Sequence, residues 1–347
     1  MGELQEGRVT GMIGDATSNR LDQAVWKHLA KVIVLDYSIW LLLVAIVAVF
    51  SSLTDSFLTP INLSNIMLHS AVLGVVVIGE SLCLLCGKFD LSVGSTVGLT
   101  GALAAWLMVS GQPAASGWEL HPAIAIPIVL LVGMAVGLFN GFFIAKVGMN
   151  PLLTTLATMI VLRGLALIVT SGESLYEFPD AYRFLGGGNL GPVPMAVIIM
   201  LLLFLVFHFV LKHRLVGRHI YIVGGNAGAA RACGIRVTRV EIFAFVMSGL
   251  LAAVGGILLS GRLDSAQTTS GTGMELEVIA AAVIGGISLA GGRGKLVNAI
   301  AGVLVVQCIA SGLILLDVEA FWIRCTTGII IFLAILIDTL KAKLRWR

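Results

Sequence analysis

The residues best able to do chemistry are charged side chains that interrupt long apolar runs. Glu80 lies within one such run and Arg163 within another. A charge at the centre of a bilayer costs roughly 2.5–3.5 kcal/mol, so such a residue is usually paired or functional. Glu80 either forms a hydrogen bond between helices or takes part in a transport pathway. Arg163 is expected to tether helices, in one arrangement by pairing with Glu80, and both are candidate pathway residues.

A polar segment at 87–95, GKFDLSVGS, separates two apolar runs. Irregular backbone at membrane depth persists only where protein or a water-filled cavity satisfies its polar groups. Ser92 is placed to cap the following helix, whose first amides would then point into a cavity. The segment is either a wall of the pathway or a plain cytoplasmic turn. On the first interpretation Asp90, Ser92 and Ser95 are pathway residues, together with Asn140, a buried amide that needs partners.

No catalytic motif accompanies these residues. The Gly-Lys pairs at 87–88 and 294–295 lack the upstream glycine and the following hydroxyl residue of a phosphate-binding P-loop. Cys83 and Cys86 form a C-x-x-C with no second pair and no histidine cluster, which favours packing over metal or redox work. We therefore expect no catalytic residue, no metal, no cofactor and no ATP hydrolysis by this chain itself.

The composition indicates that a membrane surrounds these side chains. Of the 347 residues, 58% are hydrophobic and 12% are charged, about half the charged share of a typical soluble protein. The apolar runs predict an all-α, polytopic membrane protein with about ten transmembrane helices, since each span needs roughly 20 apolar residues. The spans are expected near 36–53, 65–86, 92–109, 123–145, 151–170, 193–211, 241–261, 275–290, 297–316 and 321–339.

Lysine and arginine predict the orientation. With the N-terminus in the cytoplasm, the inner loops and the C-terminal tail hold almost all of these residues, and the outer segments hold only Arg183 and Arg262. Both termini are therefore predicted to be cytoplasmic. The expected division is an N-terminal tail at 1–35, a transmembrane domain at 36–340 and a C-terminal tail at 341–347.

The only long inner connection is a basic loop at 212–240. The glycine pair at 224–225 can turn the chain, and Asn226 is a good N-cap for the alanine-rich stretch 227–233, which Gly234 would end. The pattern predicts a helix of about eight residues, which is too short to be stable in water without docking. It docks either against the protein's own helix ends or into a partner that drives movement. Because the sequence contains no ATP-binding motif of its own, docking into a partner is the favoured interpretation.

Four stretches resemble motifs of the ribose/xylose/autoinducer-type permeases of bacterial ABC importers. They are GRHIYIVGGNAGAARACGI at 217–235, FDLSVGS at 89–95, NPLLTTLATMIVLRG at 150–164 and AAVIGGISLAGGRG at 281–294. The motifs stand in the family's order, and the resemblance extends from near residue 40 to the C-terminus. The chain departs from the family's motifs at two places near the expected pathway. Lys88-Phe89 precedes Asp90, where members commonly have Gly-Ile, and Glu80 occupies a run that is usually uncharged in the family.

The resemblance implies the permease subunit of an importer that moves a small sugar or sugar-like solute from periplasm to cytoplasm across the bacterial inner membrane. It implies cytoplasmic ABC ATPase subunits, a periplasmic substrate-binding protein and a second permease subunit, identical or different, in membrane lipid and without nucleic acid. The helix beginning at Asn226 would be the coupling helix in the ATPase cleft. The coupling residues would be Gly224, Gly225, Asn226, Ala229, Ala230, Arg231, Gly234 and Ile235. The pathway residues would be Glu80, Asp90, Ser92, Ser95, Asn140 and Arg163.

Two alternatives stay open. A permease of the same fold could import a nucleoside or a branched-chain amino acid. An ion-coupled secondary transporter, or an intramembrane enzyme, would require relay carboxylates or a nucleophile pair, and neither is evident in the sequence. Loss of residues 226–234 should abolish transport by a permease of either specificity and should matter little in an ion-coupled transporter.

Overall fold

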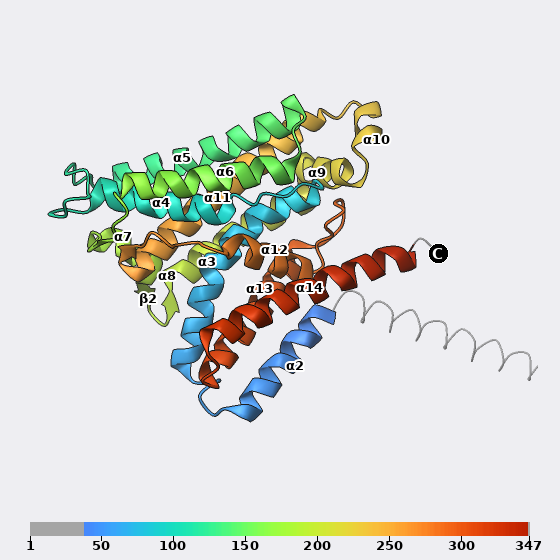
Figure 1. The fold of residues 1–347 in the computed structure, drawn as a ribbon. Helices are drawn as coiled ribbons and strands as arrows, with labels where there is room; N and C mark the ends of the chain where they lie inside the picture. The colour runs from blue at the N-terminus through green and yellow to red at the C-terminus, as the bar shows by residue number, and fades with distance from the viewer. Residues whose placement is uncertain (1–37, 346–347) are drawn as a thin grey trace, which may run out of the picture.

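The protein is mostly helical in a computed structural model, which describes residues 38–345 (Figure 1). The predicted tail at 1–35 lies outside the described residues. The helices are α2 (Ser38–Leu53), α3 (Pro60–Leu85), α4 (Val93–Met108), α5 (Pro122–Phe142), the π-helix η1 (Phe143–Val147), α6 (Pro151–Val169), α7 (Asp180–Gly187), α8 (Met195–His213), α9 (Leu215–Gly225), α10 (Ala227–Ala232), α11 (Val237–Leu263), α12 (Met274–Ile284), α13 (Leu296–Leu315) and α14 (Ala320–Arg345). The predicted helical class is therefore confirmed. Helix α14 also continues past residue 341, where the C-terminal tail was predicted to begin.

Two short strand pairs, which the sequence did not predict, join the connections. The strand β1 (Leu175–Tyr176) pairs antiparallel with β4 (Ser265–Ala266). The strand β2 (Asn189–Leu190) pairs with β3 (Val193–Pro194). The first pair connects the chain after α6 to the end of α11, so it fixes where the segment leading to α12 begins.

Within residues 38–345, six helical segments are long and apolar enough to cross a membrane. They are α3, α5 continued by η1, α6, α8, α11 and α13. Helices α2 and α4 are apolar but have 16 residues each, and α12 has 11. The prediction of about ten spans is thus confirmed for six by length and composition, whereas the spans at α2, α4, α12 and α14 remain predictions.

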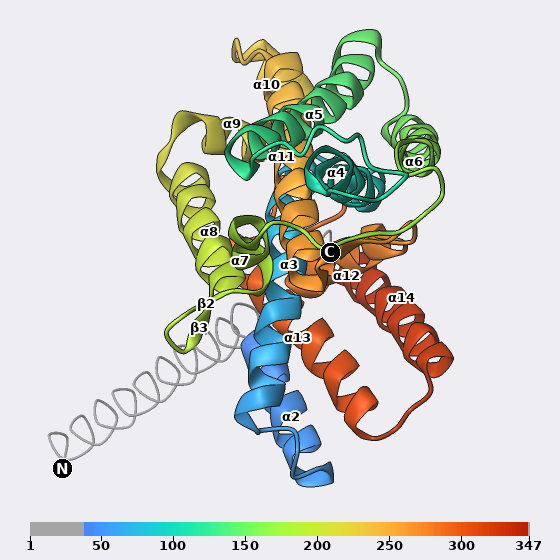
Figure 2. The ribbon, with the colours of Figure 1, turned by 90° about the vertical axis from the view of Figure 1, so that its left-hand side faces the viewer.

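Helices α3 and α11 lie at the centre of the bundle (Figure 2). Helices α4, α5 and α6 lie on one side of this pair, α8 lies on the other, and α13 packs between α3 and α2. The most apolar window of α3 is 89% buried inside the protein, whereas those of α5, α6 and α8 are each 28% buried. Helix α3 is therefore a core helix, and the other three present apolar side chains to lipid.

Glycine allows α5 and α11 to cross closely. A Cβ added to Gly133 of α5 would lie 2.5 Å from the Cβ of Ala253, and one added to Gly249 of α11 would lie 2.8 Å from the amide nitrogen of Gly137. Small residues four apart permit this approach between membrane helices. The crossing brings the polar side chains of α5 and α11 to the same end of α4.

Helices α4 and α12 both begin inside the bundle. Residues 86–92 turn back along α3 after Leu85, so the amide of Asp90 reaches the carboxylate of Glu80 at 3.2 Å. Before α12, residues 267–273 pack against α4. Non-helical backbone at membrane depth requires protein or water to satisfy it. These two breaks therefore mark the places where polar groups gather.

Candidate functional site

A set of buried hydrogen bonds converges on Asp90. Its Oδ1 accepts from the amide of Ser92 at 3.0 Å and from the hydroxyl of Ser92 at 2.5 Å. Its Oδ2 accepts from the hydroxyl of Ser248, in α11, at 3.1 Å. The carboxyl of Asp90 therefore accepts three hydrogen bonds, from two residues on different parts of the chain. Asp90 thereby fastens the segment 86–92 to α11.

The hydrogen bonds continue into α5 and α6 through Asn140. Its side-chain amide donates to Oγ of Ser92 at 2.9 Å, and its carbonyl oxygen accepts from the hydroxyl of Thr158 at 2.7 Å. Asn140 thus has the partners that a buried amide requires. We define the Asp90 network as Glu80, Asp90, Ser92, Asn140, Thr158 and Ser248, of which none is more than 8% exposed.

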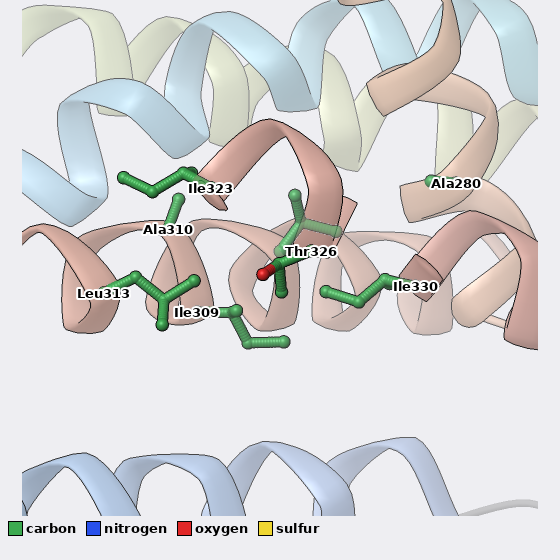
Figure 3. A pocket seen from close by; sticks show the side chains of 8 residues that line it. Ala280, Ile309, Ala310, Leu313, Ile323, Thr326 and Ile330 are labelled. Atoms are coloured by element: carbon green, nitrogen blue, oxygen red, sulfur yellow. The ribbon is translucent and has the colours of Figure 1, made fainter. Parts of the chain in front are cut away.

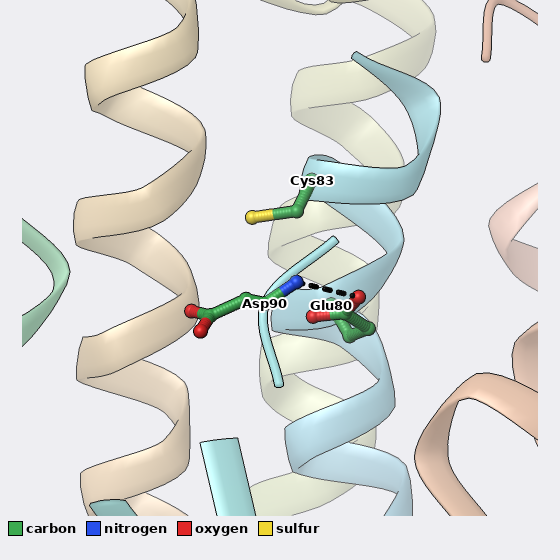
Figure 4. Close-up of side chains that lie close together, drawn as sticks. All are labelled: Glu80, Cys83 and Asp90. Atoms are coloured by element: carbon green, nitrogen blue, oxygen red, sulfur yellow. Dashed lines mark hydrogen bonds between the residues drawn. The ribbon is translucent and has the colours of Figure 1, made fainter. Parts of the chain in front are cut away.

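Glu80 and Cys83 of α3 lie beside Asp90 (Figure 4). One oxygen of Glu80 accepts from the amide of Asp90, and Oε2 has no hydrogen-bond partner among the described residues. A carboxylate oxygen of each acid and the Sγ of Cys83 lie within 4.8 Å of one another. These are ligand types that a divalent cation can use, but the oxygens of Asp90 are already occupied by donors. The contact that the structure shows is a helix-to-loop hydrogen bond.

The side chain of Ser92 does not cap α4, as the sequence predicted it would. Ser92 stands at the N-cap position of α4, but its side chain makes no cap hydrogen bond. The predicted cap is wrong because the hydroxyl of Ser92 donates to the carboxyl of Asp90 instead. The hydroxyl of Ser95 donates to the carbonyl of Ser92 at 2.8 Å. Both serines are buried around the start of α4.

Arg163 lies apart from the Asp90 network. Its Nη1, on α6, donates to the carbonyl oxygen of Ser270 at 2.6 Å. No ion pair joins it to Glu80 among residues 38–345, so a Glu80–Arg163 pair is wrong. The two residues lie at different levels along α4. The Asp90 network lies at the start of this helix, whereas Arg163 lies beside Gly98, five residues further along. Arg163 is the one predicted pathway residue that the structure does not bring to the others.

The short helix predicted to begin at Asn226 is present as α10. Asn226 is its N-cap, with Oδ1 accepting from the amide of Ala229 at 2.9 Å. Gly234 follows the helix with φ of 79°, the left-handed conformation that favours glycine. The helix has six residues rather than about eight, because Cys233 forms its C-cap. Helix α9, which the sequence did not predict, leads into it.

Three parts of the chain meet at four glycines, which we call the glycine junction. Gly87 follows α3, Gly224 lies near the end of α9, and Gly291 and Gly292 lie between α12 and α13. The amide of Gly292 donates to the carbonyl of Leu85 at 2.8 Å. A Cβ on Gly224 would lie 2.6 Å from that amide nitrogen, and one on Gly291 would lie 2.7 Å from the amide nitrogen of Gly87. Backbones this close leave no room for a side chain between them.

Two polar contacts strengthen the region around the junction. Tyr221 of α9 donates to the carbonyl of Gly294 at 3.0 Å, and burial raises the pKa of the Tyr221 phenol, so it remains a donor at neutral pH. Lys88 forms an ion pair with Glu241 of α11, with Nζ 3.4 Å from Oε1. The unusual lysine is therefore matched by a carboxylate on a neighbouring helix.

Sequence reasoning missed Thr158, Ser248, Glu241 and Glu275. A hydroxyl on a helix usually bonds to its own backbone, so Thr158 and Ser248 carry no signal in one sequence. Glu241 and Glu275 stand at the ends of apolar runs, where charge is ordinary. Lys88 also stands at the end of a predicted span, so its charge gave no signal of a partner on α11.

The pocket between α12, α13 and α14 is a different kind of site (Figure 3). Its lining is apolar apart from one threonine: Ala280, Val306, Ile309, Ala310, Leu313, Ile323, Thr326 and Ile330. Binding sites for polar solutes combine apolar walls with several convergent polar groups. This lining supplies no charged group, so we assign it no part in the site.

Known proteins resemble this chain over most of its length. The sequence model of the family described as branched-chain amino acid transport system / permease component matches residues 62–337. Ribose import permease protein RbsC of Escherichia coli K12 is 36% identical over 91% of this chain and 97% of its own. The protein of that name from Bacillus subtilis 168 is 39% identical over 86% and 90%. D-allose transport system permease protein AlsC of E. coli K12 is 34% identical over 88% and 92%. No solved structure matches the chain significantly.

The helices that are long and apolar enough to cross a membrane indicate a multi-pass membrane protein. The chain belongs to the permease family of ABC importers, which confirms the resemblance drawn from its four motifs. As a permease it is a transport subunit without its own ATPase site, and it works with ATPase and substrate-binding partners.

Proposed function

We propose that this chain forms the path by which a small sugar or sugar-like solute passes from periplasm to cytoplasm. The observation that carries the proposal is the similarity, over most of both chains, to permeases named for ribose and D-allose. The membrane would be the bacterial inner membrane, and ATP hydrolysis in partner subunits would drive the cycle. A second permease subunit, identical or different, would complete the path.

Helix α10 would be the element that the ATPase moves. Its N-cap and its following glycine give it definite ends, and its exposed residues include Ala229 and Arg231. The glycine junction supports this role because it places α9, which leads into α10, against the end of α3. The coupling residues would be Gly224, Gly225, Asn226, Ala229, Ala230, Arg231, Gly234 and Ile235.

The Asp90 network would make several helices move as one body. It connects the segment 86–92 to α3 through Glu80, to α5 through Asn140 and to α11 through Ser248. Thr158 of α6 joins the network through its hydrogen bond to Asn140. A displacement entering at the glycine junction would therefore shift the wall of the path as a unit. This fits alternating access, in which rigid groups of helices rock about a fixed site.

The remaining topology follows from the same proposal. Helices α2, α4, α12 and α14 would complete ten spans, with α4 and α12 starting partway through the membrane. Both termini would be cytoplasmic, as the lysine and arginine distribution indicates. Arg163 would face the path. The other predicted pathway residues would act near the path by holding the surrounding helices together; they are Glu80, Asp90, Ser92, Ser95 and Asn140.

Affinity purification from native membranes in mild detergent tests the proposal. We expect a P-loop ATPase to copurify and to be lost when residues 226–234 are replaced by a flexible linker of equal length. Asn226→Ser, which preserves a capping side chain, is the matched control and should retain the ATPase. A chain that purifies alone and moves solute in liposomes without ATP would contradict the proposal. Uptake of a nucleoside or a branched-chain amino acid, but of no sugar, would contradict the substrate class alone.

A further inference from the structure

Three cations lie where α8 turns into α9. They are Lys212, Arg214 and Arg218, and all three are exposed. None of them forms an ion pair within residues 38–345, and the sequence contains no acidic residue between Asp180 and Glu241. The three basic side chains are therefore available to an anion that is not part of the chain.

The turn that carries these cations is compact. Arg214 is both the C-cap of α8 and the N-cap of α9, so one residue joins the two helices. A Cβ added to Gly217 would lie 2.5 Å from the Cα and from the carbonyl oxygen of Leu211, so the first turn of α9 packs directly against the last turn of α8. The cations are thereby held close to the end of α8.

The cations continue an exposed apolar face of α8, a helix at the edge of the bundle (Figure 2). Leu202, Leu205 and Phe209 are exposed, and their spacing of three and four residues places them on one face. Lys212 follows Phe209 by three residues on the same face. The guanidinium of Arg214 lies over the Phe209 ring, with Cζ 5.1 Å from the ring centroid. The basic group therefore stands at the end of a face that contacts lipid when α8 spans a membrane.

Helix α9 adds an exposed apolar stripe to the cations. Leu215 and Ile222 are two turns apart on one face and are 66% and 46% exposed. Arg218 lies between them on this face, whereas Ile220 and Val223, on the other side of the helix, are buried. Bulky apolar residues beside basic ones on an outward face are typical of helices that lie between the headgroups and the acyl chains of a membrane.

We propose that the turn between α8 and α9 binds anionic phospholipid of the cytoplasmic leaflet. We call this surface the α8–α9 elbow and define it by five residues: Lys212, Arg214, Leu215, Arg218 and Ile222. The cations contact the lipid phosphates, and the two apolar side chains enter the region beneath the headgroups. The leaflet follows from the lysine and arginine distribution, which places this connection in the cytoplasm.

A lipid fits the elbow better than a soluble partner does, because the elbow is continuous with the apolar face of α8. The bound lipid contacts the helix that leads into α10, so it anchors the base of that short helix at the membrane surface. The inference goes beyond the proposed function. It does not depend on which solute the permease carries, and a chain that imports no sugar would still bind this lipid.

Native mass spectrometry of the full chain in mild detergent, titrated with dioleoylphosphatidylglycerol, tests the inference. Wild type should bind this lipid more tightly than dioleoylphosphatidylcholine, which has no net charge. One cation near an anionic lipid surface is worth a factor of about five in affinity. Arg218→Gln should therefore weaken binding about fivefold, and the triple variant Lys212→Gln, Arg214→Gln and Arg218→Gln should weaken it about a hundredfold.

Three further variants separate a lipid site from general attraction to charge. Arg239→Gln is the matched control, because it removes one exposed cation whose neighbours Val237 and Val240 are buried, and it should leave the affinity unchanged. Arg218→Lys keeps the charge and should bind as wild type does. Leu215→Ser combined with Ile222→Ser keeps every cation and should still weaken binding about tenfold, because the contact with acyl chains is lost.

The unfolding temperature of each variant in lipid-free detergent verifies that it is folded, since exposed side chains contribute little to stability. If the triple variant binds phosphatidylglycerol as tightly as Arg239→Gln does, the inference is wrong. It is also wrong if inorganic phosphate displaces the lipid, because the elbow would then take a free anion. A triple variant that keeps its lipid affinity but loses a copurifying ATPase would show that the ATPase covers the elbow, which overturns the inference as well.

Discussion

The Asp90 network and a second polar group, formed by Arg163, Ser270 and Glu275, lie along the same short helix, α4. Each contains one buried carboxylate oxygen without a hydrogen-bond partner in the described part of the chain. Asp90 has three donors from protein, and Asn140 uses both its amide and its carbonyl. In the second group, the guanidinium of Arg163 donates to the carbonyl of Ser270. The network therefore joins α3, α5, α6 and α11 to the segment 86–92, whereas the second group joins α6 to the segment before α12.

The largest expected effect in the network is that of Asp90→Ala. The substitution leaves the hydroxyls of Ser92 and Ser248 buried without an acceptor, which costs on the order of 3 kcal/mol of folding free energy or more. Thermal unfolding of the detergent-purified protein measures it. Asp55→Ala, at an exposed acid, should leave the unfolding temperature unchanged. Equal stability of the two variants would remove the structural role of the network.

Two substitutions of Glu80 distinguish the contribution of its charge to stability from that of its hydrogen bond to the Asp90 amide. Glu80→Gln keeps an acceptor for the Asp90 amide and should cost less than about 1 kcal/mol. Glu80→Ala removes the acceptor and leaves a cavity in the core, so it should cost about 2–4 kcal/mol. The same unfolding measurement ranks the two. A severe loss of stability in Glu80→Gln would show that the carboxylate itself is needed.

Thr158 tests whether the network reaches α6. Thr158→Val preserves shape and removes the hydrogen bond to Asn140, at a cost of about 1 kcal/mol. Thr170→Val, at the C-cap of the same helix, removes a hydroxyl that bonds to the carbonyl of Ala166, and it should cost less. Unfolding of the two variants and of an Asn140→Leu double mutant gives the coupling energy. A coupling near zero would place α6 outside the network.

The smallest effect should be at Lys88, whose side chain is 26% exposed. Lys88→Met breaks the ion pair with Glu241 and should cost about 1 kcal/mol or less. The double variant Lys88→Met with Glu241→Gln should recover most of this loss, because the unpaired carboxylate disappears with its partner. Unfolding temperatures at low and high salt measure both. A double variant less stable than Lys88→Met alone would contradict the pairing.

Much of the fold was readable from apolar run length and from local cap chemistry. Each of the ten predicted segments contains a helix, although six of them meet the length and composition of a span. The N-cap at Asn226 and the stop at Gly234 depend on neighbouring residues alone, so the prediction of α10 was accurate to about two residues. The short helices α7 and α9 lie in connections, where apolar periodicity gives no signal.

The site was only partly readable because its contacts join residues far apart in sequence. The sequence identified Asp90, Ser92 and Asn140 as polar residues in need of partners, and the structure brings them together. It could not show that Ser92 would donate to Asp90 rather than cap α4, nor that Arg163 would contact Ser270 rather than Glu80. The partners of Ser92 and Arg163 depend on how far along the neighbouring helices α4 and the segment before α12 are placed, which local sequence does not determine.

The most direct test of the account is ATP-dependent uptake of D-ribose and D-allose by proteoliposomes containing this chain, its ATPase and its binding protein. We predict uptake of at least one of the two sugars when ATP is present on the cytoplasmic side, and none when residues 226–234 are replaced by a flexible linker. Uptake that proceeds without ATP, or that is unaffected by this replacement, would contradict an ATP-driven permease that is moved through α10.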